Sequence, residues 1–279
     1  MRPLVTKIVI AIFALLLPNN LYARTIDPLF VTTSLIVGLK SGQEHLKATG
    51  FFYSDEQGKL YVVTNKHVIY GDRFAENPPP VLDQIRLKLH TDLRNLSQNK
   101  EITIDLLDGQ KRLWLEYKTD PAVDIVLIPL TISRKDYSFA SANKSFIESE
   151  NIQVGFEKIF IMGYPFGWYD EVNNLPITRV GHLSSPFKVP FRGKPVMLGD
   201  IETHKGMSGS PVFMRLDNYT EKENDKLVKR LGQSRTILIG IYSGQPLWLI
   251  ENKKTGKIIP IHHTLANIWF SELILEILK

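Results

Sequence analysis

The chain contains no cysteine among its 279 residues. Disulfide bonds, a cysteine nucleophile and thiolate-ligated metals are therefore excluded, and the fold must be held by packing alone. A chain of this length can bury a core large enough for that. Any reaction that it performs must use other side chains.

Long apolar runs are also scarce, and the main one stands near the N-terminus. Residues 8–17 (IVIAIFALLL) follow the basic residues Arg2 and Lys7, and Ala23 comes after a short polar break. The run is about half of the roughly 20 residues that span a bilayer, so it predicts a signal peptide over residues 1–23. We expect export to the periplasm or the medium, with no stable membrane insertion after cleavage. A retained membrane anchor is the alternative.

Charges of one sign are not concentrated in the chain. There are 34 Lys and Arg residues against 29 Asp and Glu residues, for a net charge of +5. Loss of residues 1–23 removes two basic residues, lowers the net charge from +5 to +3, and leaves residues 24–279 for the folded protein. Because basic and acidic residues are interleaved, no nucleic-acid partner is expected. Nothing in the sequence indicates an oligomeric state.

What the chain does have is a series of short β-branched and aromatic runs between turn residues, which is typical of strands. In the first half they occupy residues 31–38, 49–53, 59–64, 84–90, 101–106, 113–117 and 124–130. In the second half they occupy residues 158–163, 178–184, 195–201, 210–214 and 236–243. This pattern favours an all-β fold of two barrels packed side by side.

The segments between the strands suggest how these units are divided. The polar stretch 133–150 is predicted to connect an N-terminal barrel, about residues 30–135, to a C-terminal barrel, about residues 150–261. Residues 217–230 carry four acidic and four basic side chains and predict a solvated surface loop. Over residues 264–278, apolar residues recur at helical spacing and predict a terminal helix.

The strongest chemical signal is the segment 205–213, KGMSGSPVF. A serine hydroxyl becomes a nucleophile when a base takes its proton, and the oxyanion that forms needs donors placed in advance. Gly206 and Gly209 allow a tight turn in which the N–H groups of Gly206 and Ser208 point at one spot, and Pro211 starts a strand. Taken alone, the segment is equally compatible with a structural turn.

Two other segments supply partners for such a serine. His67 follows an apolar run that ends at Thr64, although a lone histidine is more often structural than catalytic. Asp124 precedes the apolar residues 125–128, where a carboxylate is costly unless it accepts hydrogen bonds, and orienting an imidazole supplies them. Asp120 is the alternative carboxylate.

Five segments together resemble the trypsin-like serine peptidases of the chymotrypsin superfamily, most nearly the bacterial HtrA-like and glutamyl-endopeptidase-like branches. They are ATGFF at 48–52, TNKHVI at 64–69, DIVL at 124–127, GYPFG at 163–167 and GMSGSP at 206–211. They occur in the family's order of histidine, aspartate and serine. The resemblance implies two six-stranded antiparallel barrels of the chymotrypsin type. Because animal trypsins are usually rich in disulfides, the absence of cysteine favours a bacterial protein.

The resemblance also implies a role for each residue. Ser208 is the expected nucleophile, His67 the general base and Asp124 the group that orients the imidazole, while the amides of Gly206 and Ser208 form the oxyanion hole. The expected reaction is hydrolysis of a protein or peptide substrate through an acyl-enzyme, without metal or cofactor. The alternative from another class is a catalytically silent module that binds peptides or a partner protein. An esterase on the same fold is a third possibility.

One residue beside the expected nucleophile departs from the family. Met207 stands where an asparagine or aspartate is usual. Trypsin zymogens mature when a new N-terminal amine pairs with that aspartate, so Met207 excludes this switch. The side chain at this position does not form the oxyanion hole, and activity need not be lost.

The substrate pocket is less clearly specified than the expected triad. Glu202 and Thr203 are expected to line it, with Tyr242, Ser243 and Gly244 as its wall. A threonine here resembles the glutamyl endopeptidases, but those usually carry a histidine where Tyr242 stands. Glu202 at the base of the pocket would instead favour arginine or lysine in the substrate. Both specificities stay open.

The remaining histidines carry weaker signals. His182 and His204 lie near the expected cleft and are candidates for substrate contact. As neighbours in the sequence, His262 and His263 face different ways and have no obvious carboxylate partner. A place on the surface or in the core is therefore favoured over a metal site for these two.

Overall fold

A computed structural model describes residues 26–72, 74–76, 78–147, 151–155, 157–251, 256, 258–261 and 263–279. The predicted signal peptide, residues 1–23, and His262 lie outside this set. Within it, no helix has both the length and the apolar character needed to cross a membrane. Strands make up most of the regular structure, which confirms the predicted all-β class.

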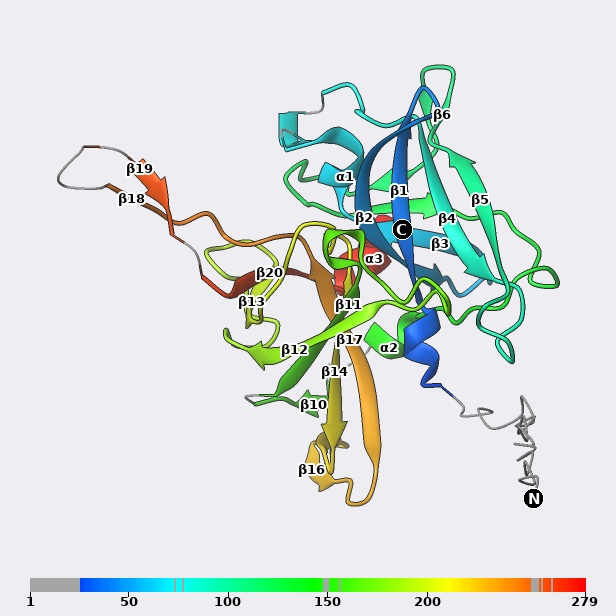
Figure 1. The fold of residues 1–279 in the computed structure, drawn as a ribbon. Helices are drawn as coiled ribbons and strands as arrows, with labels where there is room; N and C mark the ends of the chain where they lie inside the picture. The colour runs from blue at the N-terminus through cyan, green and yellow to red at the C-terminus, as the bar shows by residue number, and fades with distance from the viewer. Residues whose placement is uncertain are drawn as a thin grey trace, which may run out of the picture.

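The first half of the chain forms a seven-stranded antiparallel sheet with the strand order β5-β4-β1-β2-β3-β9-β8 (Figure 1). Each of the seven predicted runs overlaps one of its strands. The resemblance implied six strands, and the extra one is the two-residue β8, which pairs with β9. The strands are β1 (Thr33–Lys40), β2 (Gln43–Ser54), β3 (Leu60–Thr64), β4 (Gln84–His90), β5 (Asn99–Asp105), β8 (Leu115–Glu116) and β9 (Val126–Pro129).

The second half closes into a six-stranded antiparallel barrel with the strand order β11-β12-β13-β20-β17-β14. Its interior is filled by aliphatic and methionine side chains from alternate strand positions. This confirms the predicted six-stranded barrel, which extends past the expected end near residue 261 because it includes β20. The strands are β11 (Lys158–Gly163), β12 (Ile177–Leu183), β13 (Val196–Asp200), β14 (Pro211–Asp217), β17 (Ser234–Tyr242) and β20 (Leu265–Phe270).

The predicted terminal helix, residues 264–278, is wrong over its first half. Leu265–Phe270 form strand β20, which pairs with both β13 and β17, and helix α3 spans only Glu272–Ile277. Apolar residues spaced like Ile268 and Trp269 also suit a strand that is buried on both faces. Residues 265–270 form a strand because their backbone groups pair with both β13 and β17 and so close the barrel.

Helix α3 packs where the two halves meet. Leu273 and Ile274 of this helix share one buried cluster with Phe51 and Leu127 of the first sheet and Phe213 of the barrel. The interface between the halves is therefore apolar. It packs β2 and β9 of the first sheet against α3 and against β14 of the barrel.

Shorter elements form the connections. Residues 217–230, predicted as a loop, instead contain an exposed hairpin of β15 (Thr220–Glu223) and β16 (Lys226–Lys229), which pairs with β10 (Ile152–Gln153). A second hairpin, β18 (Leu249–Glu251) with β19 (Ile258–Pro260), projects from the body of the molecule (Figure 1). The others are η1 (Pro28–Val31), α1 (Lys66–Tyr70), η2 (Phe74–Glu76), β6 (Leu107–Asp108), β7 (Lys111–Arg112), α2 (Lys144–Ile147) and η3 (Pro165–Gly167).

Candidate active site

Thr49, a buried residue of β2, joins the two halves of the molecule. Its N–H donates to the Ser208 carbonyl at 2.9 Å, and its hydroxyl donates to the Gly206 carbonyl at 2.8 Å. The same hydroxyl accepts the N–H of Tyr164 at 3.2 Å, while the Thr49 carbonyl accepts the Thr64 hydroxyl at 2.8 Å. The turn that carries the predicted nucleophile is thereby held against the strand end that carries the predicted base.

His67 lies in a single helical turn, α1, directly after β3. Val68 and Ile69, which follow His67 in this turn, are buried and anchor it to the core of the first sheet. Gly71 ends the turn at φ 79°, a conformation that favours glycine, and donates its N–H to the His67 carbonyl at 2.8 Å. The His67 side chain remains 21% exposed, so it is held firmly and still reaches the surface.

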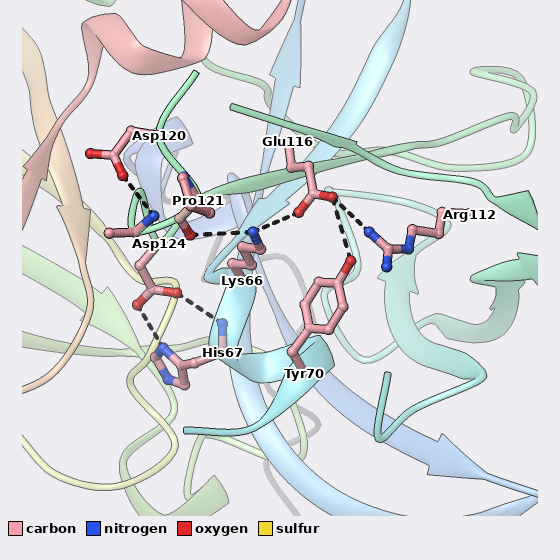
Figure 2. A network of polar contacts seen from close by, with 9 residues as sticks. Lys66, His67, Tyr70, Arg112, Glu116, Asp120, Pro121 and Asp124 are labelled. Atoms are coloured by element: carbon pink, nitrogen blue, oxygen red, sulfur yellow. Dashed lines mark hydrogen bonds and ion pairs between the residues drawn. The ribbon is translucent and has the colours of Figure 1, made fainter. Parts of the chain in front are cut away.

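The carboxylate of Asp124 binds His67 through both of its oxygens (Figure 2). Oδ1 accepts the His67 backbone N–H at 2.8 Å, and Oδ2 lies 2.7 Å from Nδ1 of the ring. Since an ionised carboxylate only accepts, Nδ1 carries the proton and Nε2 is left as a base. The Asn65 amide fixes the same segment by donating to the Asp124 carbonyl at 2.7 Å. The alternative, Asp120, is exposed and accepts the N–H of Ala122 instead.

Burial and charge act in opposite directions on the pKa of His67. Burial disfavours the imidazolium and lowers the pKa, whereas the charge of Asp124, its hydrogen bond and the charge of Asp72 raise it. The sum raises the pKa above the ordinary value of 6.5. The ring is therefore a stronger base than a free histidine because Asp124 faces it.

The turn around Ser208 requires glycine at two positions. Gly206 has φ +90° and Gly209 has φ +86°, both in the region that side chains rarely adopt. A Cβ at Gly209 would lie 2.1 Å from the Thr49 carbonyl oxygen, and one at Gly206 would lie 2.4 Å from that of Tyr164. These are the glycines that the sequence indicated for a tight turn.

Two backbone N–H groups of this turn are free to receive an oxyanion. Among the described residues, neither the Gly206 nor the Ser208 N–H donates to a protein acceptor. The Lys205 carbonyl accepts the N–H of Phe166 at 2.6 Å. Because a trans peptide is planar, the Gly206 N–H must point the opposite way, away from Phe166.

The turn that carries the Ser208 hydroxyl packs against the strand that leads to the His67 imidazole. A Cβ at Gly209 would lie 3.1 Å from Cα of Thr64, three residues before His67. Within the described chain, however, no hydrogen bond links the hydroxyl to the imidazole, whose side-chain partner is Asp124. The structure thus brings His67 and Asp124 together and packs the turn that carries Ser208 against the end of β3.

A cavity of about 710 Å³ opens beside Ser208. Of the predicted pocket residues, Glu202, Thr203, Tyr242 and Gly244 line it. The buried Tyr242 hydroxyl donates to Oγ1 of Thr203 at 2.8 Å, which leaves the Thr203 hydroxyl proton available to a substrate atom.

Two pocket predictions need correction. The carboxylate of Glu202 is not at a buried base: its side chain is 63% exposed and pairs with Arg179 and, at 3.5 Å, with His204. Ser243 is not among the residues that line the cavity, and its N–H donates to the Asn267 carbonyl at 3.1 Å.

The cavity also contains residues that the sequence did not assign to it. Gln245, Phe166 and His263 line it. Phe166 stacks on His204 with ring centroids 4.9 Å apart, so His204 does lie at the cleft, whereas His182 is exposed on β12. Phe166 belongs to the GYPFG segment, but nothing in the sequence separated it from the turn around it.

A buried lysine adjoins the predicted base (Figure 2). The Lys66 side chain is 2% exposed, with Nζ 3.0 Å from the Glu116 carboxylate and 3.3 Å from the carbonyl of Pro121. Glu116 also accepts from Arg112 at 3.1 Å and from the hydroxyl of Tyr70 at 3.4 Å. Burial, with the charge of Glu116 next in weight, raises the pKa of Tyr70 to about 12. Lys66 thus ties α1 to the segment that leads into Asp124.

No metal site competes with this arrangement in the part of the chain that the structure describes, where no three His, Asp or Glu residues are grouped to hold an ion. His263 has its own partners: Nε2 lies 2.7 Å from the Pro246 carbonyl, and Nδ1 accepts the N–H of Leu265 at 3.2 Å. The site is built from hydroxyl, imidazole, carboxylate and backbone amide groups.

The sequence profile of the trypsin-like peptidase domain matches residues 48–218. No curated protein matches the chain. Among solved structures, the fold is similar to that of the thermostable serine protease AL20 from an extremophilic microorganism. That similarity has a TM-score of 0.50 and 8% identity over 90% of this chain and 96% of that one.

Two other solved proteins are similar with slightly lower scores. They are the protease Anisep from Arthrobacter nicotinovorans and the inactivated protease paralogue S-I1 of the scabies mite. Anisep has a TM-score of 0.48 and 11% identity, covering 86% of this chain and 90% of its own. S-I1 has a TM-score of 0.49 and 15% identity, covering 90% and 93%.

At such low identities the structural likeness shows the fold alone, and that fold is chymotrypsin-like, as the sequence motifs implied. The profile match covers more than half of the chain and includes His67, Asp124 and Ser208. The chain therefore belongs to the trypsin-like peptidase family.

Proposed function

We propose that the chain is a serine endopeptidase that hydrolyses peptide bonds through an acyl-enzyme. His67, Asp124 and Ser208 are its catalytic residues, and the N–H groups of Gly206 and Ser208 form its oxyanion hole. The observation that carries the proposal is the contact of both Asp124 oxygens with His67. In the neutral ring this contact occupies Nδ1 and leaves Nε2 as the base, on a side chain that is partly exposed.

Each group has a defined task in the proposed reaction. Nε2 of His67 takes the proton of Ser208 as the hydroxyl attacks the scissile carbonyl, and the two N–H groups stabilise the oxyanion. The imidazolium, stabilised by Asp124, then protonates the leaving amine. A water molecule, activated by the same ring, hydrolyses the acyl-enzyme and restores Ser208.

The absence of a hydrogen bond between Ser208 and His67 is compatible with this reaction. Catalytic hydrogen bonds are often long or misaligned without substrate and tighten when it binds. A rotation about the Cα–Cβ bond of Ser208 changes the position of its hydroxyl without moving the turn. The alternative, a module that binds peptides without cleaving them, is favoured by the same observation and serves as the opposing outcome of the test.

A fluorophosphonate probe, which reacts only with an activated serine, tests the proposal. The wild-type protein should be labelled on Ser208, identified by mass spectrometry of the tryptic peptide, and should cleave unfolded casein. Ser208→Ala should abolish both signals. Ser210→Ala is the matched control, because Ser210 lies in the same turn, fully buried and without a recorded partner for its hydroxyl within the described chain.

Two results would contradict the proposal. Labelling that persists in Ser208→Ala would move the nucleophile elsewhere. Binding of unfolded casein without labelling or cleavage would favour the silent module. Export to the periplasm or the medium stays a prediction of residues 1–23.

A further inference from the structure

The β18–β19 hairpin carries a concentration of exposed apolar side chains that the catalytic proposal does not use. Leu247 is 73% exposed and Ile258 is 67% exposed. We call the apolar arm the set Leu247, Trp248, Leu249, Ile250, Ile258 and Ile261, all of which are exposed large hydrophobic residues. An exposed apolar surface of this kind usually marks a place where another molecule binds.

The pairing of the arm leaves it open on its edges. Within the described chain, β18 and β19 pair only with each other, in register from Leu249 opposite Pro260 to Glu251 opposite Ile258. Consecutive residues from Leu247 to Ile250 are exposed, so neither face of β18 is covered by the body of the protein. A two-stranded hairpin in water is only marginally stable, and an added strand would cover both its edge and its faces.

The root of the arm is also a wall of the active-site cavity. Gln245 and His263, on the two chain segments that lead into the hairpin, line the cavity together with Ser208. His263 holds the root in place: Nε2 contacts the Pro246 carbonyl at 2.7 Å, and the ring packs on Trp248 with centroids 4.8 Å apart. A chain that leaves the cavity on this side therefore meets the arm directly.

We propose that the apolar arm binds an extended, apolar stretch of the substrate polypeptide itself. The proposal rests on the proposed peptidase function and names the class of substrate: unfolded chains with an apolar stretch close to the scissile bond. The substrate adds as a strand to an open edge of the hairpin, and its side chains contact the arm. At about 3.3 Å per residue, the arm spans substrate positions within roughly ten residues of the bond that is cut.

The order of polarity along the hairpin favours a polypeptide over a membrane. The apolar residues adjoin the cavity, and the residues that follow β18 in the sequence, 252–257, read NKKTGK. A hairpin that entered a bilayer by its turn would have to bury these charges before its apolar part, which is costly. A chain that comes from the cavity meets the apolar part first.

Matched fluorogenic peptides test this inference. All contain one cleavable sequence, flanked on the N-terminal or on the C-terminal side by six residues that are either Leu, Ile and Val or Ser, Thr and Gln. The arm variant is Leu247→Ser/Leu249→Ser/Ile258→Ser. The control variant is Leu227→Ser/Leu231→Ser, since these two residues are as exposed (69% each) but lie outside the arm.

The wild type and the control variant should cleave the peptide with an apolar flank, on one of the two sides, with kcat/KM about tenfold higher than its polar counterpart. A tenfold ratio corresponds to about 1.4 kcal/mol. The arm variant should lose this ratio and keep its rate on the polar peptide and its fluorophosphonate labelling. Intact labelling separates a failure of this inference from a failure of the peptidase proposal.

Three results would overturn the inference. The first is a preference for apolar flanks that is unchanged in the arm variant. The second is loss of binding to vesicles of mixed anionic and zwitterionic lipid in the arm variant with unchanged peptide preference, which would assign the arm to a membrane. The third is a change of oligomeric state in the arm variant, by light scattering, with unchanged preference, which would assign the arm to a second copy of the chain.

Discussion

Substitution of Lys66 and Glu116, singly and together, should show a strong energetic coupling next to His67. Lys66→Met and Glu116→Gln both keep the approximate volume of the side chain. Glu116→Gln leaves the ammonium of Lys66, 2% exposed, without its carboxylate. Breaking a buried pair in this way costs about 3–5 kcal/mol of the free energy of unfolding.

The reverse substitution should cost less. After Lys66→Met, the Glu116 carboxylate is 23% exposed and keeps Arg112 at 3.1 Å, so solvent and a second cation compensate it. We expect a loss of about 1–3 kcal/mol, near the range for a charged hydrogen bond. The double variant should be more stable than the sum of the two losses predicts, by about 1–3 kcal/mol.

Urea unfolding followed by tryptophan fluorescence measures all four proteins of this cycle. At about 2–4 °C per kcal/mol for a chain of this size, Glu116→Gln should also lower Tm by roughly 6–20 °C. Losses that add within about 0.5 kcal/mol would show that the two groups are not coupled and would refute the reasoning. A smaller loss for Glu116→Gln than for Lys66→Met would refute the argument from burial.

Three further predictions concern His67. In Asp124→Asn, the amide oxygen still accepts the His67 backbone N–H, so the NH₂ group faces Nδ1 and the ring proton moves to Nε2. We expect kcat to fall about 10⁴-fold with the far-UV circular dichroism unchanged. A loss below tenfold would contradict the tautomer assignment. Because the pKa of His67 is raised, the acidic limb of kcat/KM against pH should have its midpoint above 6.5. The same pKa shift stabilises the fold below pH 6.5, and this contribution should be lost as pH rises through the raised pKa. Urea unfolding at a series of pH values measures it. A pH–rate midpoint at or below 6.5 would contradict the raised pKa on which both pH predictions depend.

Local patterns were sufficient for most strands and for the surroundings of the predicted nucleophile. The runs predicted at 84–90 and 158–163 coincide with β4 and β11. In the first, apolar residues alternate with polar ones and leave little choice of register, and the second is a short continuous apolar run between turn residues. Gly206 and Gly209 could be assigned to a tight turn because no other residue fits where the backbone of Thr49 and Tyr164 approaches so closely.

The contacts that the sequence did not reveal are those that depend on how distant segments meet. Lys66 and Glu116 come from α1 and β8, and only the packing of these elements makes them partners. The position of Glu202 shortly before Ser208 predicts a place at the base of the pocket. Its carboxylate instead forms an ion pair with Arg179 on β12, a contact that the sequence does not reveal. The predicted terminal helix is too long for a similar reason: its first half forms strand β20, which pairs with both β13 and β17.

Because of the contacts of Thr49, we expect activity to depend on the interface between the two halves. One residue of the first sheet holds the backbone on both sides of position 207, so any condition that separates the two halves also releases the turn around Ser208. Hydrolysis should therefore cease while each half still retains its own core. We therefore expect activity to be lost before either half unfolds and to return when the two halves associate again.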